Sequence, residues 1–114
     1  MKTYPVTRPN GSVQYFDIQN TWNSIRSIQQ LLKSIKGVSS IKFGFGLERL
    51  TFQYNGELCV VYDPEDGEGG LFYRICPKVV SESELDFSQI HSVFANHRGI
   101  LSQLLFEFRS KEKR

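Results

Sequence analysis

The sequence of residues 50–62 reads Leu50-Thr51-Phe52-Gln53-Tyr54-Asn55-Gly56-Glu57-Leu58-Cys59-Val60-Val61-Tyr62. Two runs rich in aromatic and β-branched residues flank the dipeptide Asn55-Gly56, whose two residues both tolerate positive φ angles. An Asn-Gly pair between apolar runs is the strongest short-range signal for a β-hairpin. A second, looser turn leads into residues 71–76, so residues 48–76 are predicted to form a three-stranded antiparallel meander.

The register of this hairpin depends on the length of its loop. A two-residue loop pairs Tyr54 with Glu57 and places the apolar residues of the two strands on opposite faces. A three-residue loop pairs Gln53 with Glu57 and gathers on one face Leu50, Phe52, Leu58, Val60 and Tyr62. The sequence favours the longer loop, because the sheet then has one apolar and one mixed face. A sheet covered on both faces stays open as the alternative, because the mixed face carries Cys59, Val61 and Phe72.

Length and composition are typical of one small globular domain. The chain has 114 residues, of which 39% are hydrophobic and 23% are charged. The 14 basic and 12 acidic residues give a net charge of +2, which is too small to indicate nucleic acid or a membrane surface as the partner. We therefore expect a single domain over residues 1–114, with nucleic acid disfavoured and no membrane contact.

No stretch has the features of an export signal or a membrane span. Residues 1–15 carry Pro5, Arg8 and Pro9 and lack an apolar core, and no apolar run approaches the ~18 residues that a spanning helix needs. The 2 cysteines are then expected to stay reduced. We predict a cytoplasmic protein.

The clearest helix signal lies between Asn20 and Gly37. Apolar residues recur there at three- and four-residue spacing, on one stripe of a helix, at Trp22, Ile25, Ile28, Leu32 and Ile35. Asn20 or Thr21 can cap the start of this helix, and Gly37 can take the left-handed position that ends it.

Strands are expected before and after this helix. Residues 1–11 are predicted to be a loose lead-in, although Met1–Thr7 could add an edge strand beside the strand Ser12–Ile18. Ile41–Gly46 alternates apolar residues with two glycines on the opposite side. Positions without a side chain on one strand face predict close approach of a helix, another strand or a ligand.

A second helix is predicted near the C-terminus. Apolar residues keep helical spacing from residue 90 to residue 108, and Ser88 is one of three serines that can cap the start. We expect one continuous helix from Ser88 to about Arg109, although Asn96-His97-Arg98-Gly99 could end one helix before another begins. Residues 110–114 are expected to be a frayed basic tail.

The order of these elements predicts the fold class. We expect an α+β fold, a two-layer sandwich in which a mostly antiparallel sheet carries two helices packed on one face, in the order β-α-β-β-β-α. The stripe of the first helix is expected to be buried against the hairpin residues Leu50, Phe52, Leu58 and Val60.

One stretch, Gly44-Phe45-Gly46-Leu47-Glu48-Arg49-Leu50, resembles the third signature motif of class II aminoacyl-tRNA synthetases. In that family a glycine-rich strand ends in Glu-Arg-Leu and continues into a helix, and the resemblance would make Arg49 the arginine that contacts ATP phosphates. The sequence after Leu50 predicts strand and turn instead of helix, and no partner motif is found elsewhere in the chain. We therefore assign no family.

Two phenylalanines are candidates for a nucleic-acid interface. Lys42-Phe43-Gly44-Phe45 is similar to the aromatic strand of the RNA-recognition motif, whose rings stack on bases, but its glycine is displaced by one position. A nucleotide- or RNA-binding face would use Phe43, Phe45, Arg49 and Arg74. Burial tendencies favour the other interpretation, in which both phenylalanines belong to the core.

An acidic turn is the candidate site for a protein partner. Four carboxylates lie within residues 63–68, at Asp63, Glu65, Asp66 and Glu68. Their spacing does not fit a calcium-binding loop, which needs a glycine at its sixth position and a glutamate at its twelfth. Charges on a loop tip can reach a basic patch on another protein, and we expect such a contact here.

No cofactor or metal site is predicted. Cys59 and Cys76 match no zinc motif, and the two histidines are six residues apart, so they do not share one helix face. If Glu57 lies opposite Lys78, then Cys59 lies opposite Cys76 on the neighbouring strand. Both cysteines are expected to be buried free thiols.

Together these features favour a small non-enzymatic protein-binding module, of the inhibitor, immunity-protein or regulatory-subunit type. No nucleophile–base pair, phosphate-binding loop or pair of carboxylates on rigid elements is found, so catalysis is not expected. The predicted partner is another protein. A homodimer stays open, including one with an active site between subunits, and the alternative function is the nucleotide- or RNA-binding face.

Overall fold

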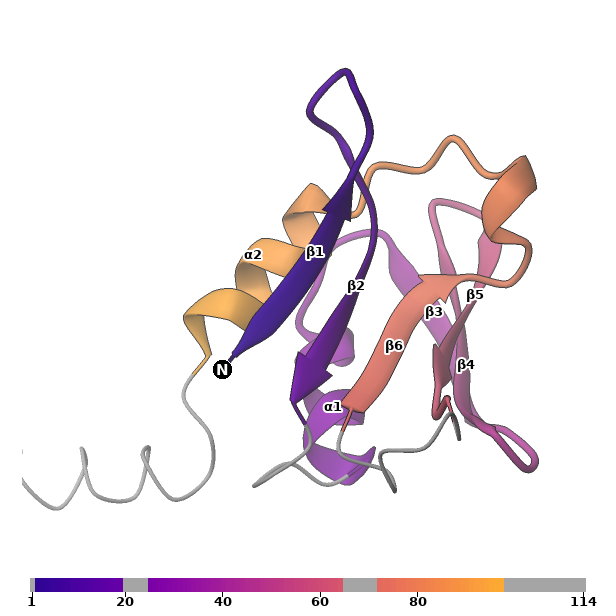
Figure 1. The fold of residues 1–114 in the computed structure, drawn as a ribbon. Helices are drawn as coiled ribbons and strands as arrows, with labels where there is room; N and C mark the ends of the chain where they lie inside the picture. The colour runs from indigo at the N-terminus through magenta and orange to yellow at the C-terminus, as the bar shows by residue number, and fades with distance from the viewer. Residues whose placement is uncertain (1, 20–24, 65–71, 98–114) are drawn as a thin grey trace, which may run out of the picture.

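The computed structural model of the chain describes residues 2–19, 25–64 and 72–97. In chain order the elements are β1 (Thr3–Thr7), β2 (Val13–Gln19), α1 (Ile25–Lys33), β3 (Val38–Phe43), β4 (Glu48–Tyr54), β5 (Glu57–Tyr62), β6 (Phe72–Pro77), the 3-10 helix η1 (Val80–Glu82) and α2 (Ser88–Asn96). These elements form an α+β fold, which confirms the predicted class (Figure 1).

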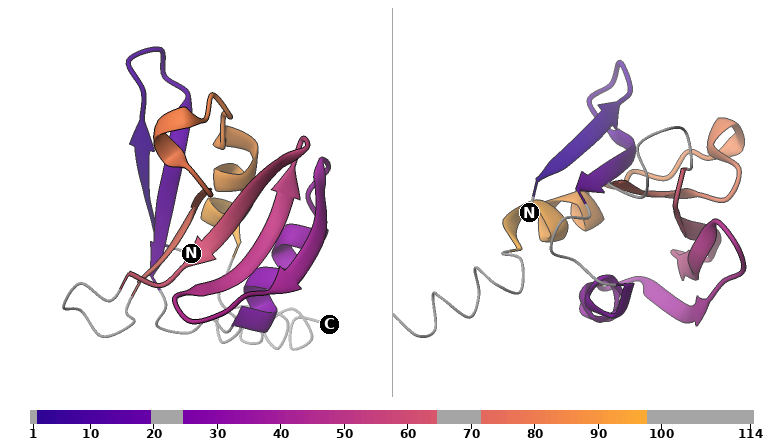
Figure 2. Two further views of the ribbon diagram at one scale, coloured as in Figure 1. Left: turned by 90° about the vertical axis from the view of Figure 1, so that its right-hand side faces the viewer. Right: turned by 60° about the horizontal axis from the view of Figure 1, so that its bottom comes forward.

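In the described part of the chain, one antiparallel sheet carries α1 and α2 on the same face (Figure 2). Its 6 strands have the order β1-β2-β6-β5-β4-β3. After β2, α1 carries the chain to the far edge of the sheet, where β3 lies, and β4, β5 and β6 then lead back toward β2. The predicted order β-α-β-β-β-α is wrong in detail, since β3, β4, β5 and β6 all lie between the helices in the described part of the chain. The predicted loose lead-in is also wrong, because Thr3–Thr7 pairs with β2 as an edge strand.

The Asn55-Gly56 turn fixes the register of the sheet. Its φ angles of 51° and 85° are both positive, as a two-residue type I′ loop requires, and Tyr54 pairs with Glu57. The three-residue loop is therefore wrong, because the twist of the short loop matches that of the flanking strands. The helix-facing residues of the hairpin are Leu50, Phe52, Cys59 and Val61, and those of the opposite, outer face are Leu58, Val60 and Tyr62.

The core lies between the sheet and the two helices. Its fully buried helical residues are Ile28, Leu32, Ile90 and Phe94. The apolar stripe predicted for the first helix is thus confirmed where the structure describes it, while Trp22 lies outside the described residues. Of its expected partners, Leu50 and Phe52 are buried in this core, whereas Leu58 is 46% exposed on the outer face.

The second helix ends earlier than its apolar pattern predicts. α2 stops at Asn96, and His97 is extended, with a ψ angle of 136°. The continuous helix to Arg109 is therefore wrong, and the chain leaves the helix inside the Asn-His-Arg-Gly stretch that the sequence offered as the alternative. Residues 98–114, including the expected basic tail, lie outside the described part of the chain.

The third strand also ends early, at Phe43. Gly44 and Gly46 lie in the turn that leads to β4, and Gly46 has a φ angle of 59°. A side chain at Gly44 would collide with the carbonyl oxygen of Glu48, so only glycine fits there. The close approach predicted for this glycine therefore exists, but the approaching group is the backbone of Glu48 at the start of β4.

A polar clamp joins the β1–β2 hairpin to the segment between η1 and α2. The Arg8 guanidinium donates hydrogen bonds to the carbonyl oxygens of Ser83 at 3.0 Å and Leu85 at 2.9 Å. The Asp86 carboxylate accepts a hydrogen bond of 2.9 Å from the backbone N–H of Val13. These bonds satisfy loop carbonyls and fix the path of the chain from η1 to α2.

Alanine substitutions should separate core positions from the outer face. Ile28→Ala and Leu32→Ala each remove a fully buried side chain and are expected to lower the free energy of unfolding by ~2–5 kcal/mol. Leu58→Ala, on the outer face, is expected to cost less than ~1 kcal/mol. Urea unfolding at neutral pH measures all three values. A core-sized loss for Leu58→Ala would contradict the register.

His91 should make stability depend on pH. Its Nε2 atom is hydrogen-bonded to Thr3 Oγ1 at 2.9 Å, its ring packs edge-on against Phe16, and burial lowers its pKa below the ordinary value. The unfolded chain therefore binds the proton more readily, so stability is complete above pH ~6.5 and falls as the pH drops below it. Thermal unfolding between pH 7.5 and 5.5 should show this loss, and His91→Gln should reduce it. An unchanged pH profile in His91→Gln would rule out this role.

Candidate protein-binding surface

The acidic turn begins beside the turn between β3 and β4. Of the predicted site, the structure describes Asp63, while Glu65, Asp66 and Glu68 lie outside the described residues. The backbone N–H of Asp63 donates a hydrogen bond of 2.8 Å to the carbonyl oxygen of Leu47, and its carboxylate lies 3.9 Å from the Arg49 guanidinium. The start of the acidic turn is thus joined to the turn between β3 and β4, although Leu47 and Asp63 are sixteen positions apart in the sequence.

The turn between β3 and β4, which we call the aromatic turn (residues 43–47), exposes two phenylalanines. Phe43 is 61% exposed and Phe45 is 94% exposed, so the expectation that both belong to the core is wrong. The reason is topological: β3 is an edge strand, and the described part of the chain places no strand beyond it. A hydrogen bond of 3.1 Å from Gly44 N–H to the Arg49 carbonyl closes the turn.

The two arginines of the predicted nucleic-acid face are both held by carboxylates. Arg74 donates two hydrogen bonds to Asp17, at 2.8 and 3.2 Å, and its guanidinium carbon lies 4.9 Å from the centre of the Tyr15 ring. Arg49 makes the ion pair at the base of the acidic turn. Strands β4 and β5 separate Arg74 from the aromatic turn. The structure therefore brings Arg49 close to the phenylalanines and keeps Arg74 apart from them.

The outer face of the sheet is richer in apolar side chains than a solvated face usually is. Three successive outward positions of β5 are apolar, at Leu58, Val60 and Tyr62, and Tyr4 and Val6 of β1 are exposed. Antiparallel sheets with one solvated face more often alternate apolar and polar residues. Among the described residues, ion pairs of Arg74 with Asp17 and of Lys78 with Glu48 cross this face.

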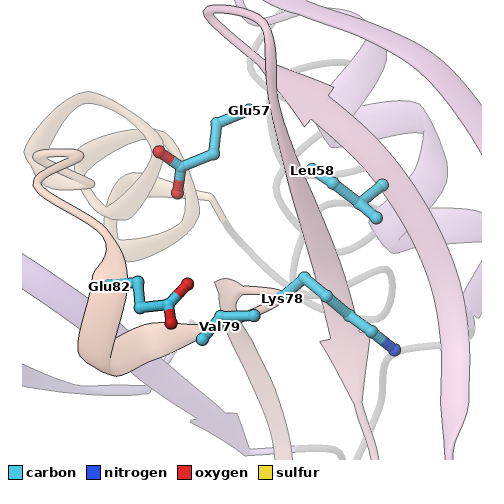
Figure 3. Close-up of a pocket in the computed structure, with 5 residues that line it drawn as sticks. All are labelled: Glu57, Leu58, Lys78, Val79 and Glu82. Carbon is cyan, nitrogen blue, oxygen red and sulfur yellow. The ribbon is translucent and has the colours of Figure 1, made fainter.

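Sequence reasoning missed one feature, a pocket of about 390 Å³ between the start of β5 and η1 (Figure 3). It is lined by Glu57, Leu58, Lys78, Val79 and Glu82. The three-residue loop would have placed Leu58 in the core and closed this corner. The available signal was the Asn55-Gly56 dipeptide, whose usual two-residue loop turns Leu58 outward.

The two cysteines lie on opposite faces of the sheet. Cys59 pairs with Pro77, and Cys76 pairs with Val60, so the predicted pairing of the cysteines is wrong by one residue. Both are buried free thiols, as expected, and burial raises the pKa of Cys59 to about 12 and that of Cys76 to about 11. Within residues 2–19, 25–64 and 72–97, no group of three or more His, Cys, Asp or Glu side chains could hold a metal ion.

No family model matches the chain, and no curated protein or solved structure matches it either. None of the helices in the described ranges is long and apolar enough to cross a membrane.

Both thiols should react slowly in the native state. Because only the thiolate attacks a disulfide reagent, burial and a raised pKa each slow the reaction. We expect a polar aromatic disulfide at pH 8 to label neither Cys59 nor Cys76 within minutes, and to label both rapidly in urea. Rapid labelling of both cysteines without denaturant would contradict this prediction.

Proposed function

We propose that the chain is a non-enzymatic protein-binding module that contacts its partner through the aromatic turn. The observation that carries the proposal is the 94% exposure of Phe45 beside the largely exposed Phe43. Burial of one phenylalanine contributes roughly 1.5–3 kcal/mol, and aromatic residues are enriched in the cores of protein interfaces. A protruding aromatic pair therefore fits an apolar pocket on another protein.

The backbone of the aromatic turn supports this role, because it is held in place before any partner arrives. Hydrogen bonds join Gly44 N–H to Arg49, Glu48 N–H to Phe45, and the base of the acidic turn to Leu47. The absence of space for a side chain at Gly44 fixes the path of the chain further. A preorganised turn loses less conformational entropy on binding than a flexible loop does.

The acidic turn is the proposed rim of the same interface. Asp63 begins this turn, and its backbone N–H is hydrogen-bonded to the Leu47 carbonyl of the aromatic turn, so the first of these acids lies beside that turn. The proposed set remains Asp63, Glu65, Asp66 and Glu68. The complementary partner surface is an apolar pocket with a basic rim, and charges at such a rim mainly speed association.

Nucleotide or RNA binding is less well supported as a function. The aromatic turn could stack on bases, but Arg49 and Arg74 are both neutralised by neighbouring carboxylates, and a phosphate would have to displace them. The small net charge of +2 points the same way. Two free thiols suit the cytoplasmic setting that we propose for the module.

Photocrosslinking tests the proposal even while the partner is unidentified. We replace Phe45 in the full chain by p-benzoyl-L-phenylalanine and irradiate it in an extract of the native cells. A covalent adduct with a second protein is expected, and excess wild-type chain should abolish it while the Phe45→Ser chain should not. The same probe at Gln30, exposed on α1, is the matched control.

Affinity measurements then follow with the purified partner. Phe45→Ser is expected to weaken binding about thirtyfold, the effect of one hot-spot residue, and to leave the melting temperature unchanged because Phe45 packs against little of the fold. An adduct with the chain itself would make the partner a second copy. Equal adducts from positions 45 and 30, or none from position 45, would overturn the proposal.

A further inference from the structure

The pocket beside η1 exists because β6 ends before it has covered all of β5. The pairing of the two strands ends at Cys59 and Pro77, and the Lys78 N–H makes one more hydrogen bond, of 3.0 Å, to the Leu58 carbonyl. The chain then turns away through Val79 into η1. The space left beside the first residues of β5 is the pocket.

Hydrogen bonds fix the position of η1, which forms one wall of the pocket. Arg8 donates to the carbonyl oxygens of Ser83 and Leu85, directly after η1, and Ser83 is itself buried. Within η1 the Glu82 N–H donates to the Val79 carbonyl at 3.2 Å. The pocket is therefore preformed, and a ligand that enters it does not have to order this segment first.

The pocket is chemically suited to a cation with an apolar stem. In Figure 3 the carboxylates of Glu57 and Glu82 point toward a shared space, while the Lys78 ammonium points away to its ion pair with Glu48. No ion pair within the described residues engages Glu57 or Glu82. The apolar part of the lining is half exposed, at 46% for Leu58 and 48% for Val79.

We propose that this pocket binds an arginine side chain of a protein partner. The aliphatic stem of arginine can cover Leu58 and Val79 while the guanidinium reaches the carboxylates. Glu57 and Glu82 come from different elements, and a guanidinium has five N–H donors that can serve two acceptors in different directions, whereas an ammonium acts as a point charge. The volume of about 390 Å³ leaves room for one arginine side chain.

This site is independent of the aromatic turn. The pocket follows the Asn55-Gly56 turn at one end of the β4–β5 hairpin, and the aromatic turn precedes β4 at the other end. The inference extends the proposed function to a second surface, but its test needs no partner protein. Its failure and the failure of the proposed function are thus distinguishable.

The test is a titration of the full chain with Nα-acetyl-arginine N-methylamide, followed by amide NMR. Saturable shifts in the millimolar range are expected for the amides of Leu58, Val79 and Glu82. The neutral isostere, Nα-acetyl-citrulline N-methylamide, should give none, and the lysine analogue should bind more weakly. Phe45→Ser should leave the arginine titration unchanged.

Charge-neutralising variants complete the test. The double variant Glu57→Gln/Glu82→Gln is expected to bind the arginine analogue about tenfold more weakly than the wild-type chain does. Glu84→Gln removes an equal exposed charge close in sequence but outside the pocket lining, and should have no effect. Shifts that the citrulline compound reproduces, or that survive in the double variant, would overturn the proposal. Equal affinity for lysine would overturn the assignment to arginine.

Discussion

The positive φ angles of Asn55 and Gly56 are the constraint on which the rest of the structure depends. A two-residue loop leaves one register for β4 and β5, and because side chains alternate along a strand, that register assigns every residue of the hairpin to a face. Leu50 and Phe52 enter the core by this rule, and Leu58 is turned out of it. A slip of one residue would close the pocket and unpack α1.

Some side chains on the outer face of the sheet are buried, although no helix in the described part of the chain covers that face. Val60 and Cys76 are nearly inaccessible there, although the core lies on the other side of the sheet. Cys76 is flanked at alternate positions by Arg74 and Lys78, which form the ion pairs with Asp17 and Glu48, and their aliphatic stems can shield apolar surface while the charged heads stay in water. Surface ion pairs themselves add little stability, so we attribute the effect to this covering.

The two proposed binding surfaces use the ends of the same rigid hairpin in different ways. At one end the chain projects an aromatic side chain, Phe45, from a turn that hydrogen bonds hold. At the other end the departure of the chain after Lys78 leaves a recess with two carboxylates. One surface can insert into a partner and the other can receive a side chain. Because neither has to be built on binding, both avoid much of the entropic cost of association.

The sequence by itself determined the features that rest on local periodicity and turn chemistry. The stripe that includes Ile28, the hairpin at Asn55-Gly56 and the α+β class are of this kind, because spacing and φ preference act within a few residues. Tertiary structure alone decided the exposure of Phe45 and the recess beside η1, where β6 stops pairing with β5. The physical reason is that exposure depends on which strand is left at the edge and on how long the neighbouring strand remains paired, and both are properties of the assembled sheet.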